Sequence, residues 1–362
     1  MTKKVKILFI GFGSFVAAAA LTVSFFAFQF LNSGVSGDTT EILFDVPPGK
    51  NMTQIANDLQ QMGLIRNGSL FLLYSRFKRM NSRLKVGEYS LSKNLTPDQI
   101  LAALISGKSV TRNLTIAEGL SIFDIAGIFE QSGLGSRKEF LELVRNKEFI
   151  KSLLNEDLES LEGYLFPETY KITKFETMKN ILAQMVRQFQ VVWARYDVLA
   201  KQKKWTRNQV ITFASIIEKE TGAGFERPLV SSVFHNRLVK KMKLQTDPTV
   251  LYGLAIQKGE MPNNISKIDL QTPTRYNSYT NYGLPPTPIS NPGEDAIKAA
   301  FQPATTNYLF FVSKNDGTHV FSETYANHNV AVKNFQVNPK AREGKSWRDL
   351  KKNQAAPKKN SP

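Results

Sequence analysis

The chain of 362 residues contains no cysteine. This absence excludes disulfide bonds, thiolate zinc sites, cysteine nucleophiles and thiol-linked lipid anchors. Histidine is also scarce, with three residues, His235, His319 and His328. No acidic residue completes a familiar metal-ligand spacing with these histidines. We therefore expect no metal site and no other cofactor.

Motifs for nucleic-acid binding and for serine catalysis are missing as well. The sequence has no RNP-like aromatic block and no Gly-rich phosphate loop, so we expect no nucleic-acid partner despite a net charge of +16. It has no G-x-S-x-G, and its two S-x-x-K strings lack the K-T-G that would accompany them in a penicillin-binding enzyme. The positive charge instead favours an anionic lipid surface or an acidic polymer as a partner. For an enzyme, a carboxylate mechanism remains.

The N-terminus carries a basic flank followed by a long uncharged run. Lys3, Lys4 and Lys6 precede residues 7–31, which contain no charged side chain. As a helix this run would span about 37 Å, enough to cross a bilayer. The lysines would stay in the cytoplasm and the bulk of the chain would lie outside. A cleaved signal peptide is the alternative, but it would have a shorter apolar region that ends at small residues. We expect an uncleaved, single-pass anchor.

Two segments of the chain resemble each other at a fixed offset. The string FDVPPGKNMTQIANDLQQMGLI begins at Phe44, and LTIAEGLSIFDIAGIFEQSGLG begins at Leu114. Their matching glycines and apolar residues are about 70 positions apart, which argues for duplication of one unit. Each copy is typical of a short strand, a glycine turn and an amphipathic helix that ends at glycine. Such units either bind an extended polymer or pack together as a spacer.

The C-terminal half is mainly helical in pattern. We expect a helix over 178–203, a helix that starts with the capping box Thr206–Gln209, a helix over 227–242, a loop region rich in Pro and Gly over 244–291, a helix that starts at Asn291-Pro292, and a hairpin made by NYLFFVS and THVFSET. A loop region of that length is unusual in a compact domain unless it lines a site.

The second of these helices contains ITFASIIEKETG, with two glutamates at its end. Glu218 shares a helical stripe with Ile211 and Ala214. Desolvation by such neighbours would raise the pKa of Glu218, so that its carboxyl could donate a proton to a leaving group. Glu220 lies beside Ile217, and periodicity does not rank the two carboxyls. Alternatively, both are surface glutamates at a helix end.

The loop region after this helix is rich in side chains suited to sugars. They are Gln245, Thr246, Asp247, Asn277, Tyr279, Tyr282 and Asn291. Amides and short carboxylates hydrogen-bond hydroxyl groups, and aromatic rings stack on sugar faces. Ordinary turn chemistry would account for the same residue types.

Four separated blocks of this chain resemble those of the YceG-like, or MltG-type, endolytic murein transglycosylases. The blocks are LEGYLFPETY (161–170), ASIIEKET (214–221), LQTDPTVLYG (244–253) and NSYTNYGLPPTPISNPG (277–293). They occur in the family's order, and the resemblance runs from the apolar N-terminal run to the last hairpin. Only the basic tail lies outside it.

The resemblance implies an α+β fold. Its N-terminal parts are a cytoplasmic N-terminus (1–6), a transmembrane anchor (7–31), a linker (32–40) and a LysM-like substrate-binding region (41–110). They are followed by a second related α/β unit (111–175), a mainly helical catalytic domain like those of lytic transglycosylases, which ends in a hairpin (176–339), and a basic, disordered tail (340–362). It also implies an enzyme held in the cell (inner) membrane with its bulk on the extracytoplasmic, or periplasmic, side.

The family cuts nascent peptidoglycan strands internally at the MurNAc–GlcNAc bond and leaves 1,6-anhydro-MurNAc ends, which would terminate glycan elongation. Its partners would be the glycan strands, the lipid bilayer through residues 7–31, and peptidoglycan synthases. The resemblance gives Glu218, the first glutamate of E-K-E-T, the role of catalytic acid/base. One carboxyl would suffice, because the C6 hydroxyl of the substrate replaces the second carboxylate of ordinary glycosidases.

The remaining candidates would hold the sugars: Glu220, Gln245, Asp247, Asn277 and Tyr279. Two other readings stay open. A non-catalytic peptidoglycan-binding scaffold would need only the duplicated region and the basic charge. A glycan hydrolase would use Glu218 together with Asp247 and a water molecule.

Overall fold

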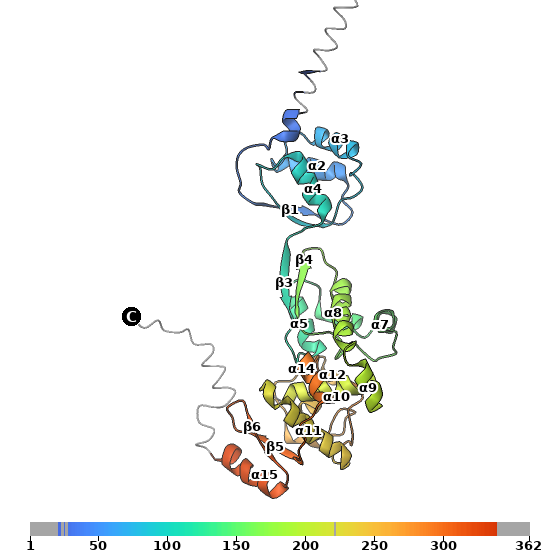
Figure 1. Ribbon diagram of the computed structural model, residues 1–362, viewed down its shortest axis with the longest axis vertical. Coiled ribbons are helices and arrows are strands. Elements are labelled where there is room, and N and C mark those ends of the chain that lie inside the picture. Colours follow the sequence, from blue (N-terminus) through green and yellow to red (C-terminus); the bar gives the residue numbers. More distant parts are fainter. Residues whose placement is uncertain (1–20, 23–24, 26–27, 221, 339–362) are drawn as a thin grey trace, which may run out of the picture. The chain divides into compact units, whose positions relative to one another are not determined.

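A computed structural model describes residues 21–22, 25, 28–220 and 222–338 of the chain. Helices and small two-stranded sheets make up two compact units, so the fold is a mixture of helix and strand (Figure 1). Unit 1 runs to Leu114 and includes Lys171–Glu176, and unit 2 holds the rest of the chain. Within the described ranges, no helix is long and apolar enough to cross a membrane. Most of the run 7–31, the N-terminus 1–6 and the tail 340–362 lie outside those ranges.

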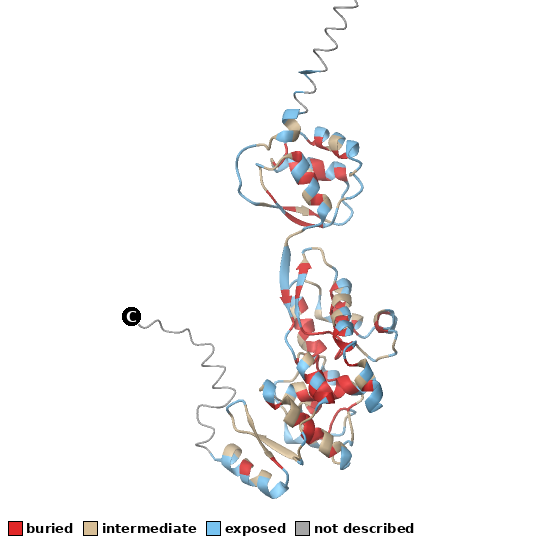
Figure 2. Ribbon diagram, in the orientation of Figure 1, coloured by how far each residue is buried: buried red, intermediate tan, exposed pale blue. Residues whose placement is uncertain are grey.

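Unit 1 has a hydrophobic core of its own. Its elements are β1 (Ile42–Val46), α2 (Met52–Gln61), α3 (Gly68–Phe77), β2 (Gly87–Leu91) and α4 (Pro97–Ser106). Strands β1 and β2 are antiparallel, with Phe44 opposite Tyr89. Helix α2 buries Met52, Ile55 and Leu59, which recur at helical spacing, and this face packs into the core (Figure 2).

The two copies of the repeated segment form matching local structures. Strand β3 (Thr111–Thr115) pairs with β4 (Thr169–Thr173) and leads into α5 (Ile122–Gln131), as β1 leads into α2. Asn51 caps α2 and Ser121 caps α5, each in a capping box. Gly49 and Gly119 both have positive φ, which glycine adopts without strain. Each copy is therefore a strand followed by a helix, as the sequence predicts.

Unit 2 also contains α6 (Arg137–Leu143), α7 (Lys147–Leu154), α8 (Met178–Trp193), α9 (Asp197–Lys203), α10 (Arg207–Glu220), the 3₁₀ helix η1 (Gly224–Glu226), α11 (Arg227–Val239), α12 (Asp247–Lys258), α13 (Lys267–Gln271), α14 (Glu294–Phe301), β5 (Phe310–Ser313), β6 (His319–Ser322), α15 (Tyr325–Val332) and the π-helical η2 (Lys333–Val337). Helix α10 is its centre: every residue from Val210 to Ile217 is buried, and α11, α12 and α14 contact it. The capping box Thr206–Gln209 at its start is confirmed.

The structure differs from the predicted elements in several places. The helix expected over 178–203 breaks between α8 and α9, where Tyr196 stacks on Phe301 and donates a hydrogen bond to Glu294. The loop expected over 244–291 contains α12, so that prediction was wrong. Pro248 in the first turn and Gly259 at the C-cap are ordinary helix boundary signals.

The helix expected to start at Asn291 begins three residues later, with Gly293 at its N-cap. Asn291 is fully buried and instead joins two distant segments. Its Oδ1 accepts a hydrogen bond from the Leu165 N–H (2.9 Å), and its Nδ2 donates to the Leu120 carbonyl (2.9 Å) and to Glu162 (3.0 Å). These bonds connect the chain just before α14 to the segments around Leu120 and Leu165.

Candidate active site

The two glutamates at the end of α10 face different surroundings. They are two residues apart, so their side chains leave the helix about 200° apart around its axis. Glu218 therefore faces α14 and the start of α11, and Glu220 faces the start of α12. The sequence alone did not separate them, but their partners do.

The carboxylate of Glu218 forms a close ion pair. Its Oε1 lies 2.8 Å from Nη2 of Arg227, and its Oε2 accepts a hydrogen bond from the Gly293 N–H (3.0 Å). The side chain is 5% exposed. Arg227 also binds Glu118 at 3.0 Å and lies 3.6 Å from Asp295. The functional group of Glu218 thus meets charged and polar partners, rather than only the aliphatic neighbours that the helical pattern indicates.

The carboxyl of Glu220 has no such cation in contact among the described residues. It accepts a hydrogen bond from the hydroxyl of Thr246. Burial raises the pKa of Glu220 to about 7, against the lowering effect of this hydrogen bond, and the negative charge of Asp247 adds to the rise. Thr246 is the N-cap residue of α12, yet its hydroxyl makes no cap hydrogen bond there. The hydroxyl of Thr246 instead donates its hydrogen bond to Glu220.

Glu220 lines a cavity of about 440 Å³. The other lining residues are Arg237, Gln245, Asp247, Tyr279, Phe310, Phe311, Tyr325 and His328. The volume and the mixture of aromatic, amide and carboxyl side chains suit a small polar ring system such as a sugar. Three of the sugar-binding candidates from the sequence, Gln245, Asp247 and Tyr279, therefore lie together with Glu220.

Within this cavity, Tyr279 and Asp247 bind each other. The Tyr279 hydroxyl donates a hydrogen bond of 2.6 Å to Oδ1 of Asp247. Burial and the neighbouring Asp247 raise the pKa of Tyr279, so the phenol keeps its proton at neutral pH. This hydrogen bond holds the carboxylate of Asp247, a hydrogen-bond acceptor, and the ring edge of Tyr279 in fixed positions on the cavity wall.

Asn277 has a different environment from the other candidates. It is fully buried, and its Nδ2 donates to the backbone carbonyls of Asp269, Leu270 and Thr272. Its Oδ1 accepts a hydrogen bond of 2.9 Å from the Tyr279 N–H. These contacts order the loop that carries Tyr279, while binding of a sugar by Asn277 itself stays a prediction.

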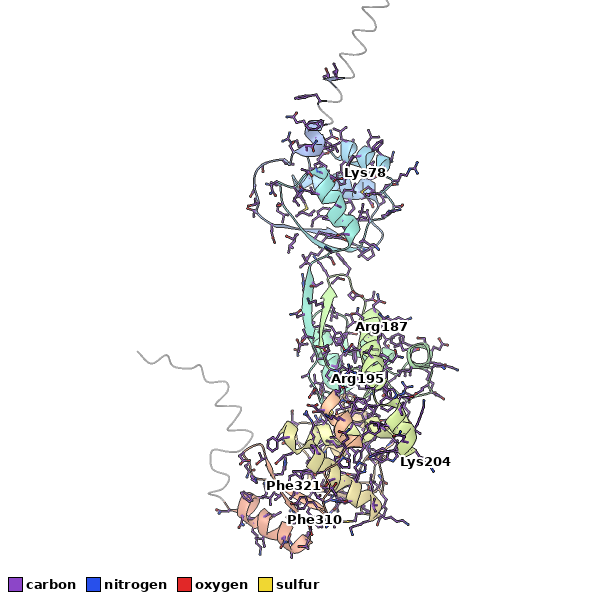
Figure 3. The ribbon with its side chains drawn as sticks, in the orientation of Figure 1. Lys78, Arg187, Arg195, Lys204, Phe310 and Phe321 are labelled. Carbon is purple, nitrogen blue, oxygen red and sulfur yellow. The ribbon has the colours of Figure 1, made fainter. Side chains whose placement is uncertain are left out.

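Sequence reasoning missed the residues that the hairpin, α15 and α11 bring to the cavity. Phe310 and Phe311 lie on β5, and Tyr325 and His328 lie on α15, which packs against both strands (Figure 3 labels Phe310). Arg237 donates from Nε to the Leu309 carbonyl (2.7 Å) and from Nη1 to the Leu244 carbonyl (2.5 Å). The density of aromatic residues in this segment was the available signal, but it also fits a packed hairpin.

Comparison with known proteins finds a matching family and relatives that carry the same name. Residues 44–334 match the YceG-like family. An endolytic murein transglycosylase of Bacillus subtilis is 32% identical over 311 residues, which cover 82% of this chain and 85% of that protein. One of Streptococcus pneumoniae is 31% identical over 79% of this chain, which spans 57% of that longer protein.

A solved structure is similar as well. The crystal structure of a yceG-like protein from Listeria monocytogenes is 34% identical in sequence, with a TM-score of 0.55. The similarity covers 80% of this chain and 99% of that one.

Proposed function

Since the chain belongs to the YceG-like family, we propose that it is a peptidoglycan lytic transglycosylase that cleaves glycan strands internally. The cut falls between MurNAc and GlcNAc and leaves a 1,6-anhydro-MurNAc end. The cavity on unit 2, with its sugar-suited wall and one carboxyl of raised pKa, supports this reaction.

The observation that carries the assignment of the acid is the position of Glu220. Its carboxyl lines the cavity and has a pKa of about 7, so a large fraction is protonated at neutral pH and can donate. Glu218, which the sequence resemblance favoured, is engaged by Arg227 and the Gly293 N–H. We therefore propose Glu220 as the catalytic acid, with Glu218, which the resemblance implies, as the alternative that the two variants below decide.

The reaction needs one carboxyl acting twice. The protonated Glu220 donates its proton to the glycosidic oxygen as the bond from C1 of MurNAc to that oxygen breaks. The resulting carboxylate takes the proton of the C6 hydroxyl as O6 bonds to C1, which restores the acid. No water is consumed, and the intramolecular attack gains from proximity. Gln245, Asp247 and Tyr279 hold the sugars beside the reacting carbon.

The proposal extends to the regions outside the catalytic cavity. Residues 7–31 anchor the chain in the cell membrane, with the N-terminus cytoplasmic, and the uncharged run behind three lysines supports this topology. Residues 41–110 act as a LysM-like region that binds glycan strands, and peptidoglycan synthases are partners at the membrane. The repeated strand–helix pattern and the net charge of +16 support binding to an extended acidic polymer.

The test is product analysis with two matched variants. Murein sacculi treated with the protein should yield 1,6-anhydro ends, detected by mass spectrometry. Glu220→Gln should lower the rate by about 10²–10⁴-fold, because the proton donor is lost. Glu218→Gln should keep most of the activity of the folded protein, with folding checked by circular dichroism.

Each other outcome has a definite meaning. An inactive, folded Glu218→Gln protein beside an active Glu220→Gln protein would return the catalytic role to Glu218. Reducing ends that incorporate oxygen-18 from water would indicate a hydrolase. Binding to sacculi without release of fragments would indicate a scaffold.

A further inference from the structure

Helix α3 of unit 1 leaves a row of large apolar side chains exposed. Leu70, Leu73 and Phe77 recur at spacings of three and four residues, so they lie on one face of the helix. Their exposed fractions are 47%, 64% and 83%. The opposite face buries Phe71 and Ser75 in the unit. An exposed apolar row of this kind marks a surface that another molecule covers.

The segment around this row carries positive charge alone. Asp58 is the last acidic residue before α3, and Glu88 is the first one after it. The basic residues between them are all exposed: Arg66, Arg76, Lys78, Arg79, Arg83 and Lys85. Asp98 on α4 pairs with Lys78, at 3.4 Å (Figure 3 labels Lys78). An apolar row among exposed cations is typical of a helix that lies in the surface of an anionic bilayer.

The chain that enters unit 1 from the N-terminal side lies beside α3. Residues 28–32 are helical, and Phe30 packs against the core of the unit. Arg66, which directly precedes the N-cap of α3, donates from Nη2 to the Gly34 carbonyl (2.9 Å). Figure 1 shows the short helix of residues 28–32 and α3 at the same end of unit 1, with β1 at the other end.

The segment expected as a linker, residues 32–40, is bound to the surface of unit 1. The Ser36 N–H donates to the Lys93 carbonyl (3.1 Å), and the Asn94 N–H donates to the Asp38 carbonyl (3.1 Å). A segment held in this way leaves little free chain between the apolar run 7–31 and the unit. If that run crosses a bilayer, unit 1 lies at the bilayer surface, with α3 at its near end.

We propose that α3 docks on the surface of the anionic bilayer in which residues 7–31 are anchored. Leu70, Leu73 and Phe77 enter the boundary between headgroups and acyl chains, and the surrounding basic side chains bind lipid phosphates. The inference rests on the proposed membrane anchor and adds a second contact with the same membrane.

Quenching by spin-labelled lipids tests this contact on the full chain. Because the chain has no cysteine, one introduced thiol carries the only fluorescent label. Ser69→Cys places a nitrobenzoxadiazole group beside the apolar row of α3, and Ser90→Cys places it on β2 as the matched exposed control. The vesicles contain phosphatidylcholine and phosphatidylglycerol, with doxyl groups on some acyl chains. The label at position 69 should be quenched, and the label at position 90 should not.

Surface variants identify the side chains responsible. Leu73→Ser combined with Phe77→Ser should reduce the quenching at position 69 by about half or more, because the two most exposed apolar side chains of the row are lost. Leu43→Ser removes a side chain on β1 that is 55% exposed and should change nothing. Arg76→Gln should lower the ratio of docked to undocked protein about fivefold on anionic vesicles and leave it unchanged on phosphatidylcholine alone. Circular dichroism checks that each variant is folded.

The outcomes separate the docking from the anchor. A label at position 69 that the lipids do not quench, in a chain that alkaline carbonate fails to extract, would overturn the docking and keep the anchor. Quenching at position 69 in a chain that carbonate extracts would keep the docking and reject the anchor. Protection of this label from aqueous iodide without quenching by lipid would mean that a protein or glycan surface covers α3, which would also overturn the docking. Anhydro ends released from sacculi report the lyase function separately.

Discussion

The two carboxyls of α10 differ in what surrounds them, and the proposed catalytic role of Glu220 rests on this difference. The negative charge of Asp247 raises the pKa of Glu220, and the hydrogen bond from Thr246 lowers it, with burial as the largest cause of the net rise to about 7. A general acid must be protonated to act. The balance of these contacts should therefore be visible in the pH dependence of the rate.

We expect kcat/KM to fall as the pH rises through about 7, because the protonated fraction of Glu220 is lost there. Thr246→Val removes the hydrogen bond that lowers the pKa of Glu220, so the pH at which kcat/KM falls should rise. Asp247→Asn removes a negative charge that raises this pKa, so the pH at which kcat/KM falls should become lower. Rates of anhydro-end formation between pH 5 and 9 give both shifts.

These opposite shifts identify the titrating group even if each variant also changes the maximal rate. If the pH at which kcat/KM falls is the same in both variants but changes in Glu118→Gln, whose side chain shares Arg227 with Glu218, the acid would be Glu218. Native-like circular dichroism spectra of the variants at pH 6 and pH 8 are the required control.

Sequence reasoning at this scale named both carboxyls but not the contacts that distinguish them. A helical pattern shows the direction in which a side chain leaves α10, and it places Glu218 beside apolar residues. It does not show that Arg227 and Gly293 arrive there from other segments, or that Thr246 turns to Glu220. Such contacts depend on tertiary packing, and they determine which carboxyl faces the cavity.

At the scale of elements, the start of α11 is held to α10 through one guanidinium. Arg227 is 12% exposed in its side chain and pairs with Glu218, while Glu118 and Asp295 lie on its outer side. Removing one partner of a buried ion pair leaves an uncompensated charge, which is strongly destabilising. Arg227 and Glu218 together thus connect Glu118, α11 and the start of α14 to α10.

Arg227→Ala should lower the free energy of unfolding by about 3–5 kcal/mol, because Glu218 then lies buried without its cation. The double variant Arg227→Ala with Glu218→Ala should recover part of this loss. Arg195→Ala is the matched control: its pair with Glu294 is exposed on both sides, so the change should stay within about 1 kcal/mol. Urea denaturation measures all three. Equal losses for Arg195→Ala and Arg227→Ala would contradict the connecting role.

Elements with their own local signals were predicted best. The final hairpin and the capping box of α10 have turn and cap residues that act over a few positions. Helix α12 was missed because prolines and glycines around it favoured a loop, although its boundaries carry those same residues in helix-start and helix-end positions. The break between α8 and α9 depends on Tyr196 packing against α14, which a local pattern does not contain.

At the scale of the whole molecule, the candidate cavity belongs to one of the two compact units. Unit 1 has a core of its own, and every residue that lines the cavity belongs to unit 2. If unit 1 binds glycan strands, as we propose, it acts by tethering. A tether raises the effective concentration of a long strand at the cavity but does nothing for a strand too short to reach both units.

We therefore expect a fragment of residues 111–338, which keeps β3 and β4 paired, to retain the reaction on short soluble strands within about a factor of three. On long strands its kcat/KM should fall by about 10²-fold or more, the usual gain from a second linked site. Anhydro ends counted on strands of graded length measure the difference, and Glu220→Gln in the same fragment is the inactive control. If the rates on short and long strands fell together in a fragment whose circular dichroism spectrum is native-like, unit 1 would contribute to the reaction itself rather than to capture of the polymer.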